Sequence, residues 1–306
     1  MSLLAHARGF FGIGISSAEQ EHSQSRGIVL LLLGVLSFSL MDAIAKYLAP
    51  RYDPVQIVWA RYFVNFLVVI LLLGRSVGPT YRTRNATVQV LRGFSQLASV
   101  GLFFTSLGFI GLAEATAIMD SNPVLITLGA ALFLGEPIGW RRIVGIIIAL
   151  VGAMIIIRPG TGVFQPAAVL PLLGAFTYAA GAILTRKARH DPIATSVLWT
   201  ATIGTILTSA LVGFYWTPIQ PGDIWAFIAI GVIGAVAQAL IIRAFAVAEA
   251  SAIAPFGYVG IVFAATWGWL FWGTVPDLWT IIGATIVVAG GIYVWTREAR
   301  ATKKAI

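Results

Sequence analysis

The sequence contains no cysteine and only three histidines among its 306 residues. The absence of cysteine excludes disulfides, thiolate nucleophiles and cysteine-ligated metals. His6, His22 and His190 all lie outside the long apolar runs, which excludes a histidine-based metal site or catalytic triad within those runs. A phosphate-binding loop of the form G-x-x-x-x-G-K-S/T is also missing, so the chain by itself cannot drive a pump with ATP. These absences predict a protein that is not an enzyme and holds no metal or cofactor.

Charged residues are scarce as well, at 10% of the chain, whereas hydrophobic residues make up 58%. A soluble domain carries about 25% charged residues, so this chain has too few to cover a surface in water. Its mean hydropathy of +0.90 likewise indicates a protein embedded in the lipid bilayer. The net charge of +8 does not point to nucleic acid, because no polar segment interleaves basic with aromatic side chains. We therefore expect a membrane protein with no nucleic-acid partner.

Ten mostly apolar runs approach or exceed the roughly 20 residues that a spanning helix needs. The expected spans are residues 27–48, 55–73, 88–110, 112–134, 142–157, 167–185, 193–215, 223–245, 251–272 and 278–296. Residues 1–25 show no signal-peptide pattern and are expected to form a loose polar tail. Residues 297–306 form a basic C-terminal tail.

Two Asp-Pro pairs stand where expected helices begin, Asp53-Pro54 at the second and Asp191-Pro192 at the seventh. An aspartate in this position can accept hydrogen bonds from the free N–H groups of the first turn. Proline suits the first helical position because its missing N–H is not needed there. We expect both aspartates to cap their own helices.

Lysine and arginine gather in alternate loops, and such a bias sets the orientation of a membrane protein. With a cytoplasmic N-terminus most basic residues lie inside, whereas the last two outside loops have none. The inside residues are then Arg75, Arg82, Arg84, Arg141, Arg142, Arg186, Lys187, Arg189, Arg297, Arg300, Lys303 and Lys304. We expect both termini in the cytoplasm and a location in the bacterial inner membrane.

Short stretches of the first half recur in the second. LAEATAI (112–118) returns as VAEASAI (247–253), and VGIIIALVGA (144–153) returns as IGATIVVAGG (282–291). The copies lie five helices apart, and because five is odd the second copy must be inverted in the bilayer. Inverted repeats occur in many secondary transporters, which bind substrate near the midplane between the halves. The predicted fold class is an all-α integral membrane protein with ten transmembrane helices in two inverted five-helix repeats, residues 26–158 and 166–296.

The stretch GLAEATAIMDSNPVLITLGAALFLGEPIGWRRIVGIIIALVGAMIII (111–157) resembles the EamA-type module of the drug/metabolite transporter superfamily. LGAFTYAAGAILTRKARHDP (173–192) resembles it in the second half, whereas WLFWGTVPD (269–277) departs from the pattern because it lacks Gly-Glu-Pro. Within the superfamily the chain is most similar to YddG-type exporters of aromatic and other amino acids. The resemblance implies a central cavity lined mainly by helices 1, 3, 4, 6, 8 and 9, with helices 5 and 10 packed behind.

Repeat and resemblance together predict a secondary transporter that exports small metabolites, chiefly amino acids including aromatic ones, by alternating access. Phosphorylated sugars, nucleotide-sugars and aromatic or cationic drugs are the alternative substrates in the superfamily. An intramembrane enzyme and a channel are more distant alternatives. Uniport, exchange and proton antiport are all compatible with the sequence, and no oligomer is required.

Ionisable side chains inside spans are costly to bury and are candidates for function. Asp42 and Lys46 lie four residues apart and share a helix face. They either neutralise each other or serve an outer gate and the substrate's amine. Asp42 and Asp120 are the candidates for carrying a coupled proton. Arg61, Arg92 and Arg243 either bind a substrate carboxylate or form ion pairs and hold helix ends.

Proline falls inside two expected spans, at Pro123 and Pro255. Each removes a backbone hydrogen bond and tends to kink its helix. Asn122 and Tyr258 lie close to these prolines in the sequence. We expect either cavity walls that bend during transport or static kinks that neighbouring groups satisfy.

The remaining candidates are uncharged. Gln96, Ser99 and Gln238 either hydrogen-bond an amino acid's ammonium and carboxylate or hold helices together. Aromatic rings in the cavity would stack on an aromatic substrate, although Trp and Tyr also anchor helix ends in the interface. The aromatic candidates for the cavity are Phe38, Phe103, Tyr178, Tyr258 and Trp267.

Overall fold

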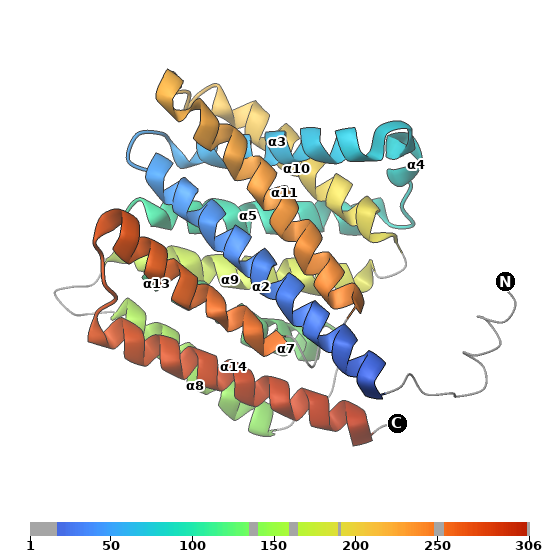
Figure 1. Ribbon diagram of the computed structural model, residues 1–306, viewed down its shortest axis with the longest axis vertical. Coiled ribbons are helices and arrows are strands. Elements are labelled where there is room, and N and C mark those ends of the chain that lie inside the picture. The colour runs from blue at the N-terminus through green and yellow to red at the C-terminus, as the bar shows by residue number, and fades with distance from the viewer. Residues whose placement is uncertain (1–16, 135–139, 159–164, 189–190, 248–253, 305–306) are drawn as a thin grey trace, which may run out of the picture.

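The computed structural model describes residues 17–134, 140–158, 165–188, 191–247 and 254–304. Every regular element in these ranges is a helix, and the helices pack side by side in one bundle (Figure 1). The first half supplies α2 (Ser17–Leu48), α3 (Pro54–Leu73), η1 (Gly74–Ser76), α4 (Val77–Thr80), α5 (Ala86–Leu107), α6 (Leu112–Met119), α7 (Asn122–Leu134) and α8 (Trp140–Ile157). The second half supplies η2 (Pro166–Ala168), α9 (Val169–Lys187), α10 (Ile193–Val212), η3 (Pro221–Asp223), α11 (Ile224–Val247), η4 (Ala254–Tyr258), α13 (Val259–Trp272) and α14 (Leu278–Lys304).

The helices are long and apolar enough to account for the expected spans. Seven described stretches meet the length and hydropathy of a membrane span: Ser25–Leu48, Pro54–Thr80, Ala86–Leu107, Leu112–Phe133, Pro166–Thr185, Ile193–Val212 and Pro221–Ala244. Three shorter apolar helices cover Ile143–Ile157, Phe256–Trp272 and Leu278–Tyr293. Each of these stretches coincides with one expected span.

The helix boundaries differ from expectation at both ends of the chain. α2 begins at Ser17, so the described part of the N-terminal segment is helical and not a loose tail. α14 continues to Lys304 and includes most of the basic C-terminal tail. Extending a helix that already exists adds one hydrogen bond per residue without a new nucleus, which explains why polar residues at both ends continue the spans.

Packing follows the predicted repeat. α2 packs most extensively on α11, and their counterparts α9 and α5 form the corresponding pair. α3 packs on its own counterpart α10, and α8 packs on α14, as an inverted duplication requires. The contact between α8 and α14 is close, since a Cβ on Gly152 would lie 2.8 Å from the carbonyl oxygen of Gly283. Small residues allow such close approach of helices in membranes.

The largest buried cluster lies toward one end of the bundle. Leu48 at the end of α2, Ile57 at the start of α3, and Leu107 and Leu112 on either side of the turn between α5 and α6 are all almost completely buried. The loop that precedes α11 lies at this end too, so we call it the Asp223 end. The opposite end carries α4, the loop between α9 and α10, and the last turn of α14 (Figure 1), and we call it the Asp191 end.

Candidate substrate site

The fourth span is interrupted in its middle. α6 ends at Met119 and α7 begins at Asn122, so Asp120 and Ser121 are not helical. Pro123 cannot donate a backbone hydrogen bond and its ring crowds the preceding turn. The side-chain amide of Asn122 donates to the carbonyl oxygen of Met119 at 3.0 Å, and the Ser121 hydroxyl donates to that of Ile118 at 2.8 Å. Local side chains thereby satisfy backbone groups that the break releases.

The ninth span is irregular at the corresponding place. Its described part begins with the 3-10 helix η4 and becomes α-helical at Val259. Transporters with inverted repeats build their substrate sites from such discontinuous helices near the bilayer midplane. The two irregular spans therefore mark the region where a site is expected.

A central cavity with two adjoining compartments lies beside the break. The first compartment has a volume of about 370 Å³ and the second about 380 Å³. They share the lining residues Phe38, Asp42, Thr116, Asp120, Asn122, Tyr178 and Ile241. From there the second compartment continues along Leu31 and Val35 of α2, toward the Asp191 end.

Charged side chains of both signs line this cavity. Asp42 and Asp120 lie on its walls together with Arg61, and no ion pair joins any two of the three, all of which are described. The Arg61 guanidinium instead lies over the ring of Phe104, with 5.4 Å between its carbon and the ring centroid. The cavity thus holds two carboxylates and one cation with room between them.

Two oxygen atoms that α6 and the break after it contribute to the cavity wall are buried without a partner in the described part of the chain. They are Oδ2 of Asp120 and Oγ1 of Thr116. A buried polar atom left unsatisfied costs about 1–3 kcal/mol, so such atoms call for an explanation. A bound polar molecule, water or proton at this place would remove the cost.

Most of the candidate residues from the sequence come together here. Those that line the cavity are Phe38, Asp42, Gln96, Ser99, Phe103, Asp120, Asn122, Pro123, Tyr178, Gln238 and Tyr258. Ser99 also holds two helices together, because its hydroxyl donates to the carbonyl oxygen of Gly174 at 2.9 Å. The side chain of Pro255 lies outside the described part of the structure.

Two described candidates, Lys46 and Trp267, are not among the residues that line the cavity. For Trp267 this contradicts the expectation that its ring lines the cavity. The indole N–H of Trp267 donates to the hydroxyl of Ser39 at 3.0 Å, and its ring stacks on Phe271. Lys46 does not pair with Asp42, although both residues are described. Its ammonium donates to the carbonyl oxygens of Leu107 at 3.0 Å and Ile110 at 2.7 Å. Its positive charge thereby lies at the C-terminal end of α5, where the helix dipole favours a cation.

Sequence reasoning undervalued Arg61 and did not select Thr116, Met41 or Met119, which also line the first compartment. The available signal for Arg61 was its position inside an apolar run, where a charge is costly. Arg92 shows the alternative role, because its guanidinium donates to Thr185 and to the carbonyl oxygen of Ser196 and so joins three helices. Thr116 and the two methionines gave no signal, because such residues are ordinary in any span.

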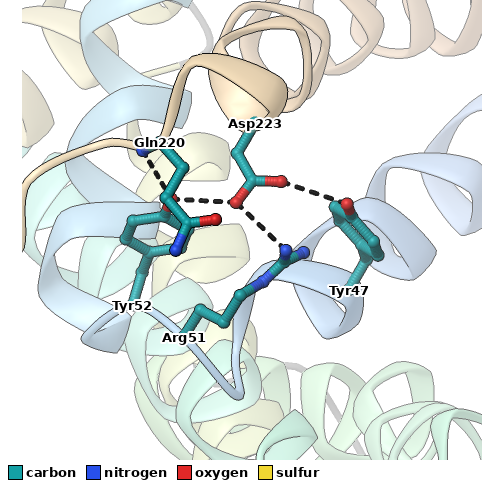
Figure 2. Close-up of polar contacts among 5 residues, drawn as sticks. All are labelled: Tyr47, Arg51, Tyr52, Gln220 and Asp223. Atoms are coloured by element: carbon teal, nitrogen blue, oxygen red, sulfur yellow. Dashed lines mark hydrogen bonds and ion pairs between the residues drawn. The ribbon is translucent and has the colours of Figure 1, made fainter.

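Asp223 clamps the two halves together at its end of the bundle (Figure 2). Its carboxylate accepts hydrogen bonds from the hydroxyls of Tyr47 at 3.0 Å and Tyr52 at 2.9 Å, and pairs with Arg51 at 3.3 Å. The backbone N–H of Gln220 donates to the Tyr52 hydroxyl at 3.0 Å. Burial raises the pKa of Tyr52. This Asp223 clamp fixes the corner between α2 and α3 to the start of α11.

Asp191 clamps the halves at the opposite end, which corrects its expected role as a helix cap. Asp53 does cap α3, since its carboxylate accepts from the N–H of Val55 at 2.8 Å, but among the described residues no side chain caps α10. Asp191 instead accepts from the hydroxyl of Thr83, the side-chain amide of Gln89 and the N–H of Arg84. The hydrogen bond from Thr83 contributes most to lowering the pKa of the Asp191 carboxyl.

Known proteins resemble this chain over nearly its whole length. The pseudopaline exporter of Pseudomonas aeruginosa is 29% identical over 269 residues, covering 87% of this chain and 94% of that protein. The riboflavin transporter of Vibrio cholerae is 28% identical, covering 93% and 97%. The S-adenosylmethionine uptake transporter of Rickettsia bellii is 25% identical, covering 92% and 97%. None of these three is named as an amino-acid exporter, so the narrower likeness to YddG-type exporters stays a prediction.

A solved crystal structure of a protein 18% identical to this chain has the same fold, with a TM-score of 0.63 over 91% of this chain and 99% of the other. The EamA-like transporter family matches the sequence twice, at residues 25–158 and 165–296. Two copies of this unit agree with the two inverted repeats that the helix packing shows. The chain therefore belongs to the EamA-like transporter family and is an integral membrane transporter of small molecules, not an enzyme.

Proposed function

We propose that this protein exports small zwitterionic metabolites, chiefly amino acids and aromatic ones among them, by alternating access. The observation that carries the proposal is the composition of the central cavity. Two carboxylates, one guanidinium, amides and aromatic rings surround the same space beside a broken helix. These groups match the ammonium, the carboxylate and the ring of an aromatic amino acid.

The charges of the cavity suit a zwitterion better than an anion. Asp42 or Asp120 would accept hydrogen bonds from the ammonium, and Arg61 would donate to the carboxylate, as guanidinium groups commonly do. Gln96 and Gln238 can donate to the carboxylate or accept from the ammonium. A bound zwitterion would also supply the partner that the buried Asp120 oxygen lacks.

Size and shape also support a small aromatic substrate. Each compartment is near the lower end of the roughly 300–1,000 Å³ typical of small-molecule sites. Phe38 and Tyr178 line both compartments and Phe103 the first, so a flat ring would have aromatic walls to stack on. Among the relatives' substrates, riboflavin and S-adenosylmethionine each join an aromatic ring system to a polar chain, which fits the same kind of cavity.

The inverted repeats and the uneven packing of the two ends support alternating access. Buried apolar side chains fill the Asp223 end, whereas the second compartment continues toward the Asp191 end. If the termini are cytoplasmic, as the arginine and lysine bias predicts, the cavity extends toward the cytoplasm in this structure. Such a state would load substrate from inside, as an exporter requires.

A proton is the coupling ion that this cavity favours. With both carboxyl groups ionised, Asp42 and Asp120 carry one negative charge more than Arg61 balances, so one added cation makes the site neutral. The substrate's ammonium and a proton would then compete for the same carboxylates. A carrier that exchanges them would move substrate out as protons enter.

Export of aromatic or cationic drugs is the second candidate, because the same carboxylates and rings would bind an aromatic cation. Phosphorylated sugars and nucleotide-sugars fit less well. Arg61 is the one basic side chain among the described residues that line the cavity, and a phosphate group is normally held by several donors or cations.

The deciding experiment is efflux from proteoliposomes loaded with tryptophan, phenylalanine, threonine, an aromatic cation or a sugar phosphate. We expect efflux of the amino acids, with tryptophan and phenylalanine fastest, and faster efflux when the outside is acidic. Movement of the aromatic cation alone would establish the drug-exporter alternative. Movement of the sugar phosphate alone would contradict the proposed roles of Asp42 and Asp120.

A further inference from the structure

Tyr258 stands between the central cavity and a groove on the outside of the bundle. The groove runs between α13 and α14 and has a volume of about 680 Å³. Among the described residues, Tyr258 is the one that lines both this groove and the second compartment. Tyr258 therefore lies at the boundary of the two spaces, and we call its side chain the Tyr258 wall.

The groove belongs to the surface that faces the bilayer. Apolar residues of α13 and α14 make up most of its lining, and Val262 and Ile281 on it are 60% and 51% exposed. Within a membrane such side chains contact lipid chains and not water. A path through the Tyr258 wall would thus connect a polar cavity with an apolar one.

The position of the Tyr258 ring depends on a glycine of α14. A Cβ built on Gly291 would overlap the Tyr258 hydroxyl oxygen and lie 2.5 Å from Cζ. The neighbouring Gly290 has a different role, because a Cβ there would meet Ala149 of α8. Gly291 is therefore the residue that makes room for the end of the tyrosine side chain.

Shape and not hydrogen bonding holds the ring there. The Tyr258 hydroxyl is buried and accepts or donates no hydrogen bond within the described part of the protein. A buried hydroxyl without a partner is costly, and phenylalanine would fill the same space without that cost. A tyrosine wall whose position rests on one glycine is open to a direct steric test.

We propose that Tyr258 sets the length of the longest apolar side chain that the central cavity accepts. The inference rests on the proposed function, because it places the zwitterionic head at Asp42, Asp120 and Arg61. A substrate side chain that extends along the second compartment meets the Tyr258 ring at its wall. Without the ring, the chain continues into the groove between α13 and α14.

The test uses α-amino acids that keep the same head and differ only in a linear side chain: norleucine, α-aminooctanoic acid and α-aminodecanoic acid. We expect kcat/KM of the unmodified protein to fall about fivefold or more from the shortest to the longest, because forced overpacking costs about 1–3 kcal/mol. In Tyr258→Ala the fall should shrink to about twofold or less. An undiminished fall in Tyr258→Ala would overturn the proposal.

Three further variants separate the wall from general damage. Val262→Ala enlarges the groove without touching the wall and should keep the length profile of the unmodified protein. Gly291→Ala pushes the ring off α14 toward the cavity and should disfavour even α-aminooctanoic acid. Adding Tyr258→Ala to Gly291→Ala should restore acceptance of the long chains, because the two changes act through one contact. A Gly291→Ala profile equal to that of the unmodified protein would contradict the wall.

A second measurement does not depend on the identity of the substrate. The chain contains no cysteine, so Thr116→Cys places a single thiol on the cavity wall. We expect Tyr258→Ala to accelerate its reaction with a long-chain alkyl methanethiosulfonate supplied from the bilayer, relative to the methyl reagent. Acceleration without any amino-acid transport would support the wall and reject the proposed function. Unchanged labelling in Tyr258→Ala would reject the wall itself.

Discussion

The two halves of the molecule share a fold but use their charged residues differently. The charges that line the central cavity, Asp42, Arg61 and Asp120, all come from the first half. The second half contributes uncharged groups such as Tyr178 and Gln238. In the alignment of the two repeats, Trp199 corresponds to Arg61 and Pro255 corresponds to Asp120. These two positions of the second copy therefore carry no charge.

Three acidic residues of the second half, Asp191, Asp223 and Asp277, lie instead at the ends of the bundle, where they bind the first half. Asp191 accepts from Thr83 and Gln89, and Asp223 accepts from Tyr47 and Tyr52. Asp277 forms an ion pair with Arg158 at the end that also carries Asp223. Duplication thus explains the fold, and the two copies differ in where their charged residues lie: the first half supplies the charges of the proposed site, and the second half supplies acidic residues that hold the halves together. The following variants test this separation.

The largest effect is expected from neutralising a cavity carboxylate. Asp120→Asn removes the charge that would accept from the substrate's ammonium, and a hydrogen bond to a charged group contributes about 1.5–3 kcal/mol. We expect kcat/KM for tryptophan to fall roughly tenfold to a hundredfold, with a weaker response to a pH gradient. Asp42→Asn should act in the same direction. Efflux in proteoliposomes with and without the gradient measures both changes.

Asp53→Asn is the matched control, because it makes the same substitution in the same half outside the cavity. Asparagine caps a helix as well as aspartate does, so α3 should remain intact and transport should be unchanged. If Asp120→Asn and Asp42→Asn transported normally and kept their response to pH, the first half would have no special role in binding.

The next effect should be on stability and not on transport. Asp223→Ala leaves the hydroxyls of Tyr47 and Tyr52 without their acceptor, at a cost of about 1–3 kcal/mol. We expect the thermal midpoint in detergent to fall by several degrees, while the folded fraction transports tryptophan at a nearly normal rate. Arg51→Gln should cost less, because Arg51 is 37% exposed and water and salt weaken exposed ion pairs. A normal midpoint with lost transport would make the Asp223 clamp part of the transport cycle.

Uncharged cavity groups of both halves should show smaller and similar effects. Gln96→Ala and Gln238→Ala each remove one neutral hydrogen-bonding group, which contributes about 0.5–1.5 kcal/mol. A decrease in kcat/KM of roughly threefold to tenfold is expected, without a change in the thermal midpoint. Val236→Ala, two residues before Gln238 and 49% exposed, should leave both quantities unchanged. Equal losses in Gln238→Ala and Asp120→Asn would remove the contrast between the halves.

The sequence was sufficient to predict the helices, the inverted repeat and most of the polar and aromatic residues that line the cavity. Apolar runs and repeated phrases are local patterns, and Asp42, Asp120 and Gln96 are conspicuous inside such runs. The roles of Asp191, Lys46 and Trp267 could not be read in this way. Each depends on a partner in another part of the fold: Thr83 for Asp191, carbonyl oxygens of the α5–α6 turn for Lys46, and Ser39 for Trp267.

The smallest effect concerns the pH dependence of stability at the Asp191 end. Hydrogen bonds from Thr83, Gln89 and Arg84 lower the pKa of the Asp191 carboxyl in the folded protein below its unfolded value of about 3.9. Such a group stabilises the fold above the unfolded pKa, and its contribution disappears as the pH falls through the folded pKa. Asp191→Asn should therefore reduce the midpoint slightly at neutral pH and flatten its decrease below about pH 4. If the variant and the unmodified protein lost stability in parallel on acidification, Asp191 would not act through its charge. Its contacts with Thr83, Gln89 and Arg84 would then depend on hydrogen-bond geometry that asparagine also provides.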